Sequence, residues 1–212
     1  MEMLKNMEDV LQQGSEVAVR ENVEKALQAG IPAERILNEG LIAGMSVVGK
    51  LFKEGEIYIP EVLIAAKNMH AGMDILKPYL VKAGVKSIGK ILLVTVKGDL
   101  HDIGKNIVGM LLVGAGFEVL DLGIDVPREK IAEAVRAHEP DILGLSALLT
   151  STMIEMEAVI KSLKDAKFKK IPKVLIGGAP VTQKFADDIG ADGYASDGVE
   201  AIMKAKELLA IS

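Results

Sequence analysis

The stretch GKILLVTVKGDLHDIGKNIVGMLLVGAGFEVLDLG, residues 89–123, contains two short apolar runs separated by a turn and a helix-like segment. The runs at 89–96 and 117–123 are continuous rather than alternating, as is typical of strands buried on both faces. The turn after the first run places His101 between two aspartates. This stretch predicts a strand, a helix and a second strand of a parallel sheet.

Three further apolar runs follow, at residues 141–147, 173–179 and 191–195, with helical segments between them. Five strands alternating with five helices predict a flavodoxin-like or Rossmann-like doubly wound α/β domain over residues 87–212. Ligands of such sheets lie at the carboxyl ends of the strands. The loops that we therefore expect to form the site are residues 97–104, 146–151, 177–180 and 194–198.

The preceding part of the chain, residues 1–86, has helical periodicity and predicts a four-helix bundle. A short helix is expected near 3–13, and longer ones are expected within 15–30, 31–55 and 59–84. Each of the three longer segments ends in glycine, a frequent residue just beyond a helix, and the last two carry proline near their starts. Short loops between them predict antiparallel neighbours.

Composition excludes several classes of function. The chain has no cysteine, which excludes disulfides, iron–sulfur clusters, thiolate zinc sites and a cysteine nucleophile. A net charge of −5 and only three tyrosines, four phenylalanines and no tryptophan argue against a nucleic-acid partner. The longest apolar stretch, 107–117, is too short to span a bilayer, and the first residues lack a secretion pattern. We expect a soluble cytoplasmic protein without a membrane partner.

The turn around His101 fits poorly to the common alternatives. A phosphate-binding loop would have shorter glycine spacing and a hydroxyl residue at Asn106, and it would lack the two aspartates. A small metal site needs convergent ligands, but His70 and His138 are not spaced as partners of His101. Ser146 ends a predicted strand outside the G-x-S-x-G pattern of a nucleophile.

One pattern unites the polar and glycine residues at three successive strand ends. D-x-H-x-x-G occupies 99–104, S-x-L follows at 146–148 after 41 intervening residues, and G-G follows at 177–178 after another 28. This set resembles the cobamide-binding signature of corrinoid proteins, with its order and spacing intact. The resemblance covers nearly the whole chain, and no signature position departs from it.

The resemblance implies a role for each signature residue. His101 would be the axial ligand of the cobamide cobalt, in place of the cofactor's own lower base. Asp99 would hydrogen-bond with the imidazole, and Ser146 would hydrogen-bond with the aspartate. Gly104 would let the loop turn close beneath the ring, and the glycine pair Gly177 and Gly178 would leave room for the nucleotide tail. The other cofactor-binding positions expected in this domain are Asp102, Ile103, Leu148, Thr150, Tyr194, Ala195 and Asp197.

Residues 44–69 add a second resemblance, to the helical cap that precedes the cobamide domain of methionine synthase and of methyl-carrier proteins. By this resemblance Phe52, Ile59 and Val62 would cover the upper face of the corrin ring. Alternatively, the same side chains simply pack two helices together. The cap would have to move about a hinge near residues 84–89 to admit partner enzymes.

The function implied by the resemblance is that of a methyl carrier, which would not turn over alone. A substrate:corrinoid methyltransferase would load the methyl group, and a methylcobamide:acceptor methyltransferase would pass it to tetrahydrofolate or a thiol. A corrinoid reductive activator would be a further partner. A mutase subunit, a cobamide-based sensor and a binder of another small ligand are the alternatives, and the methyl donor is left open.

Overall fold

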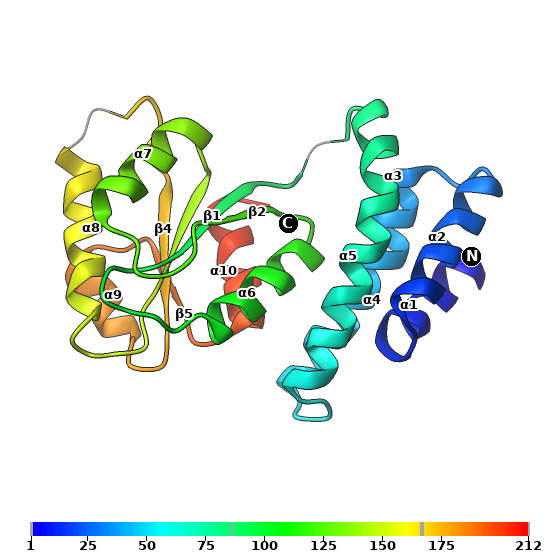
Figure 1. Ribbon diagram of the computed structural model, residues 1–212, viewed down its shortest axis with the longest axis horizontal. Coiled ribbons are helices and arrows are strands. Elements are labelled where there is room, and N and C mark those ends of the chain that lie inside the picture. Colours follow the sequence, from blue (N-terminus) through cyan, green and yellow to red (C-terminus); the bar gives the residue numbers. More distant parts are fainter. Residues whose placement is uncertain (1, 86, 166–167, 212) are drawn as a thin grey trace. The chain divides into compact units, whose positions relative to one another are not determined.

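The computed structural model describes residues 2–85, 87–165 and 168–211 (Figure 1). The chain divides into two compact units: a helical unit of residues 1–87, to which residues 114–116 are also assigned, and an α/β unit of residues 88–113 and 117–212. Residue 86, within the segment where we expect a hinge, lies outside the described residues. No helix in the described part of the chain has the length and apolar character that crossing a membrane requires.

The helical unit contains the four predicted helices. The bounds of its elements are α1 Glu2–Gln13, α2 Glu16–Gln28, α3 Ala33–Ile36, the π-helix η1 Leu37–Ile42, α4 Ala43–Lys53 and α5 Ile59–Lys82. The third predicted helix is therefore α3, η1 and α4 in direct succession. Ser15 caps α2 by accepting the Ala18 N–H at 3.3 Å. At the start of α5, Tyr58 donates its backbone N–H to the Glu61 carboxylate at 3.0 Å.

Apolar side chains from all four helices fill the core of this unit. Leu11, Val19, Ile36 and Met69 are each at most 1 % exposed. Asn68 is a buried polar residue of this unit, and it donates its side-chain amide to the carbonyl oxygens at Leu11 (3.0 Å) and Gly14 (3.2 Å). Since those carbonyls lie at the end of α1, the buried amide satisfies groups that the helix leaves unpaired.

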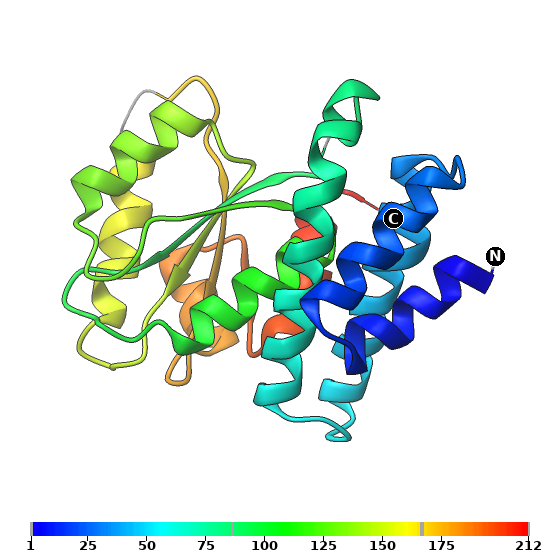
Figure 2. The same cartoon turned by 45° about the vertical axis from the view of Figure 1, so that its right-hand side comes forward.

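The α/β unit is the predicted alternation of strands and helices. Its elements are β1 Lys90–Thr95, α6 Ile103–Gly114, β2 Glu118–Asp121, α7 Arg128–His138, β3 Ile142–Ser146, α8 Met153–Asp165, β4 Lys173–Gly177, α9 Gln183–Ile189, β5 Gly193–Ala195 and α10 Gly198–Leu208. All strand pairs are parallel, in the order β2-β1-β3-β4-β5. Helices α7, α8 and α9 cover one face, and α6 and α10 cover the other (Figures 1 and 2). The predicted fold class is confirmed.

The strand register determines which loops can form a site. Thr95, Ser146, Gly177 and Ala195 form one row across the sheet, close to the carboxyl ends of β1, β3, β4 and β5. In the sheet, β2 lies on one side of β1, and β3, β4 and β5 lie in that order on the other side. The loops after β1 and β3 therefore flank the point where the strand order reverses, which is where ligands of such sheets bind.

Candidate functional site

Asp99 is the polar centre of the site, and it is fully buried. Its Oδ1 accepts the His101 backbone N–H at 3.1 Å and lies 2.7 Å from the imidazole Nδ1. Its Oδ2 accepts the Thr152 hydroxyl (2.7 Å) and the backbone N–H groups of Leu148 (2.7 Å) and Leu149 (3.3 Å). One carboxylate thus connects the loop after β1 to the loop after β3.

These contacts keep Asp99 ionised. Burial alone would raise the pKa of the Asp99 carboxyl, because a buried charge loses its hydration. Hydrogen bonds from the Thr152 hydroxyl, the Leu148 N–H and His101 act in the opposite direction and prevail, so the pKa of Asp99 lies well below its usual range. Since an ionised carboxylate accepts, His101 carries its proton on Nδ1.

The other imidazole nitrogen, Nε2, then presents a lone pair. The His101 side chain is 50 % exposed, and within the described residues no hydrogen bond involves Nε2. Thr95, fully buried at the end of β1, donates its hydroxyl to the His101 carbonyl at 3.0 Å and so holds the backbone of this residue. A neutral imidazole fixed through Nδ1 by a carboxylate is a well-oriented metal ligand through Nε2.

Large apolar side chains are exposed in the loops and first helical turns that follow β1, β2 and β3. Ile103, the first residue of α6, is 73 % exposed, and Leu148 and Leu149 are each 42 % exposed. The further members of this set are Leu100, Ile124 and Ile154. Exposed apolar groups at one edge of a sheet mark a surface that a ligand or partner covers.

The glycine that makes the turn of this loop is Gly98, and not Gly104 as expected. Gly104 is the second residue of α6 and has no left-handed backbone, so it does not make the turn. The turn requires Gly98 instead, whose φ is +80°. A Cβ at Gly104 would meet no atom within 4 Å, so this glycine leaves open space one turn along from His101.

The pair Gly177 and Gly178 is also explained differently. A Cβ at Gly178 would lie 1.9 Å from the Ala147 carbonyl oxygen, and its φ of +127° suits only glycine. A Cβ at Gly177 would lie 3.0 Å from the Ala195 carbonyl oxygen. Adjacent backbone of the protein itself therefore requires glycine at 178 and leaves little room for a side chain at 177. The role of this pair in leaving room for a nucleotide tail stays a prediction.

Ser146 does not hydrogen-bond with Asp99, which corrects the predicted chain of residues. Its backbone carbonyl accepts the Val96 N–H at 3.1 Å, as its place at the end of β3 dictates. Thr152, buried just before α8, supplies the hydroxyl that Asp99 accepts. The sequence offers hydroxyl groups at several positions between β3 and α8, and spacing alone could not distinguish them.

The remaining predicted positions of the α/β unit follow the carboxyl ends of the strands, and no hydrogen bond in the described structure joins their side chains to the Asp99–His101 pair. Thr150 is exposed, and the carbonyl of Asp102 accepts the Asn106 N–H at 2.7 Å in the first turn of α6. Tyr194 packs partly against the core, and Ala195 is buried. Asp197 caps α10 by accepting the N–H groups of residues 199 and 200, each at 2.8 Å.

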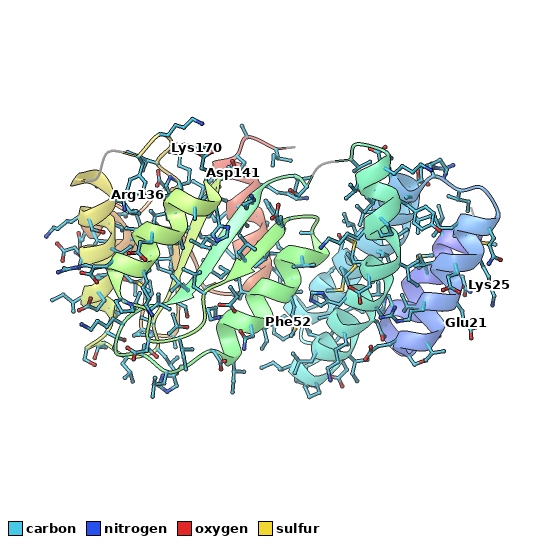
Figure 3. The ribbon with its side chains drawn as sticks, turned by 45° about the horizontal axis from the view of Figure 1, so that its top comes forward. Glu21, Lys25, Phe52, Arg136, Asp141 and Lys170 are labelled. Carbon is cyan, nitrogen blue, oxygen red and sulfur yellow. The ribbon has the colours of Figure 1, made fainter. Side chains whose placement is uncertain are left out.

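In the helical unit the three predicted positions differ in exposure. Phe52 lies on α4 (Figure 3) and is half-buried, whereas Ile59 is 44 % exposed. Val62 is fully buried on the stripe of α5 that also carries Ala65, Ala66 and Met69. The Val62 side chain therefore belongs to the packed interior, and whether Phe52, Ile59 and Val62 cover a ligand stays a prediction.

The residues of the α/β unit fit a cobamide. His101 offers one axial nitrogen, the side chains around it are apolar, and Gly104 leaves space that a Cβ would fill. These are the requirements of a broad, largely apolar ring whose metal already has its equatorial ligands. Among the described residues, His, Asp and Glu form no cluster of three that could hold a bare metal ion.

Comparisons with known proteins agree with this chemistry. Residues 89–203 match the family described as B12 binding domain, and residues 3–77 match a second family with the same description. Dimethylamine corrinoid protein 2 of Methanosarcina acetivorans is 46 % identical over 210 residues, which are 98 % of this chain and 96 % of that protein. The chain belongs to the corrinoid protein family. The predicted family and its cobamide cofactor are confirmed.

Two solved structures resemble this chain over nearly its whole length. A cobalamin-binding protein of Desulfitobacterium hafniense is 34 % identical with a TM-score of 0.79, over 97 % of this chain and 98 % of that one. A chain of the methanol:cobalamin methyltransferase complex of Methanosarcina barkeri is 32 % identical with a TM-score of 0.87. That match covers 100 % of this corrinoid protein and 81 % of the other chain.

Proposed function

We propose that this corrinoid protein carries a methyl group on a cobamide whose cobalt is bound by His101. The observation that carries the proposal is the Asp99–His101 pair, in which a buried carboxylate holds Nδ1 and leaves Nε2 half-exposed. A relative named for dimethylamine and a structure titled for a methanol methyltransferase support a methylated amine or alcohol as the donor class.

The chain's own residues hold and orient the ligand. When bound, the cobamide supplies a cobalt that accepts and releases the methyl group. Asp99 fixes the imidazole tautomer, while Thr152 and the Leu148 N–H keep that carboxylate ionised and in place.

The proposal includes its partners and the role of the first domain. One methyltransferase loads the methyl group, a second transfers it to tetrahydrofolate or a thiol, and a reductive activator restores the cofactor after oxidation. The family match over residues 3–77 supports the predicted first domain, residues 1–86, as a cap for the cobamide that residues 87–212 bind. The hinge near 84–89 and the cytoplasmic location expected from the sequence belong to this proposal.

The visible spectrum of the protein loaded with methylcobalamin tests the ligand assignment. Wild type should show histidine-ligated cofactor, and His101→Ala should show the unligated, base-off spectrum. His138→Ala is the matched control, because His138 is an exposed histidine at the end of α7. Identical spectra for wild type and His101→Ala would contradict the assignment.

The carrier role has a separate test. Wild-type protein loaded with methylcobalamin is mixed with a methylcobamide:thiol methyltransferase and its thiol, and the thioether is quantified. We expect about one thioether per bound cofactor in a single round. Absence of thioether with an acceptor enzyme that is active on free methylcobalamin would exclude that acceptor branch.

A further inference from the structure

Residues 121–125, from the end of β2 into the loop before α7, contact the chain both before and after His101. Before the histidine, Asp125 contacts Gly98; after it, Asp121 contacts Lys105. We call this segment the clamp segment. Within the described residues no hydrogen bond or ion pair joins any of these four residues to the imidazole ring, and none has a part in the function proposed above.

Asp125 holds the loop before His101 by two hydrogen bonds. Its carboxylate accepts the Gly98 N–H at 2.7 Å, and its own backbone N–H donates to the Asp99 carbonyl at 3.0 Å. Asp125 has a left-handed backbone with φ of +52°, which is uncommon for residues other than glycine. Such a conformation persists where surrounding contacts determine it, and here both contacts reach the ligand loop.

Asp121 holds the chain after His101 through an ion pair. Lys105 lies in the first turn of α6, and its side chain is only 2 % exposed. Its ammonium contacts the Asp121 carboxylate and donates to the Asn106 side-chain carbonyl at 3.3 Å. Asp121 also accepts the Gly123 N–H at 2.8 Å. Because a buried ammonium requires a charged partner, this pair ties the start of α6 to the end of β2.

We propose that the clamp segment is a positioning element for His101, which fixes the imidazole so that ligation of cobalt through Nε2 is favoured over the unligated state. This inference rests on the function proposed above. Contacts that orient a metal ligand without touching the metal typically change metal affinity 10- to 100-fold. Loss of either contact should therefore lower the ratio of ligated to unligated cofactor roughly tenfold.

The test measures this ratio by visible absorbance in methylcobalamin-loaded protein, at one fixed pH. Asp125→Gly removes the carboxylate without strain, because glycine accepts a positive φ. Asp121→Asn keeps the shape and the acceptor for the Gly123 N–H but removes the charge opposite Lys105. Each variant should show roughly tenfold less ligated relative to unligated cofactor than wild type.

Two further variants separate positioning from general stability. Asp125→Asn keeps an acceptor oxygen for the Gly98 N–H and should restore the wild-type ratio. Asp141→Asn is the matched control (Figure 3). Like the clamp residues, Asp141 accepts hydrogen bonds from a lysine ammonium, that of Lys170, and from a backbone N–H, that of Lys90 at 2.8 Å. Asp141 immediately precedes β3, at the amino edge of the sheet, so its variant should keep the wild-type ratio.

Asp121→Asn leaves a buried ammonium unpaired, so a second variant avoids loss of folding. Lys105→Met combined with Asp121→Asn removes both charges and the tie, and it should lower the ratio in a folded protein. A wild-type ratio in this double variant and in Asp125→Gly would overturn the inference, as would an equal decrease in Asp141→Asn. If wild type itself matches His101→Ala, the proposed function fails, and the clamp role fails with it.

Discussion

The carboxyl edge of the sheet and the turn between α4 and α5 were both expected to face the cofactor, but they differ in kind. At the edge, Asp99 is fully buried, and polar contacts from two loops determine its position. At the turn, Phe52, Ile59 and Val62 are apolar and range from fully buried to exposed. Polar contacts have partners and angles that specify a site, whereas apolar side chains serve a core and a ligand equally well.

The largest effect is expected at the centre of the polar edge. Asp99→Asn places an amide among N–H and O–H donors from His101, Leu148, Leu149 and Thr152 and leaves several of them unpaired. The free energy of unfolding of the cofactor-free protein should fall by roughly 3–5 kcal/mol at neutral pH. Chemical denaturation measures it. A loss as small as that of a surface substitution would show that the edge is not held by this carboxylate.

The same variant changes the response to acid. Because the pKa of Asp99 is lowered by folding, the unfolded state binds more protons as the pH falls through the usual range of about 4. The stabilisation from this carboxylate is present above that range and is lost as the pH falls toward the folded-state pKa. Between about pH 6 and about pH 3, wild type should therefore lose more stability than Asp99→Asn. Parallel curves would contradict this.

The next largest expected effect is a difference in stability between alanine substitutions at two glycines of the same edge, Gly178 and Gly104. In Gly178→Ala the new Cβ would lie 1.9 Å from the Ala147 carbonyl oxygen at a φ of +127°, so we expect a loss of about 3 kcal/mol. Gly104→Ala is the control, because its Cβ enters open space within a helix. Thermal unfolding without cofactor should show no loss for Gly104→Ala, whereas its cobamide affinity should fall. Equal losses of stability would refute the distinction.

These positions show how far the sequence alone could lead. Continuous apolar runs predicted the parallel sheet, and the motif around His101 predicted the ligand, because both depend on order and spacing along the chain. The partner of Asp99 depends on how the loop after β3 folds, and so Thr152 was missed in favour of Ser146. Likewise, whether a glycine faces backbone, as at Gly178, or open space is decided only by tertiary structure.

The turn of the helical unit can be tested with one pair of variants. Val62→Ala should lower the free energy of unfolding by about 2 kcal/mol, because Val62 is fully buried. Ile59→Ala should change it by no more than about 0.5 kcal/mol, since Ile59 is 44 % exposed. If the turn covers the cofactor, Ile59→Ala should also weaken cobamide binding measured by titration. Unchanged affinity would leave helix packing as the role of these side chains.

The smallest expected effect compares two hydroxyl residues of the α/β unit. Thr152→Val keeps the volume but loses the hydroxyl that donates to Asp99 at 2.7 Å, and it should lower the free energy of unfolding by about 1.5 kcal/mol. Ser146→Ala should change it by no more than about 0.5 kcal/mol, because in the described structure only its backbone is hydrogen-bonded. Chemical denaturation of both cofactor-free variants measures the difference. A larger loss for Ser146→Ala than for Thr152→Val would contradict the assignment of Thr152 as the hydroxyl residue that stabilises this edge through Asp99.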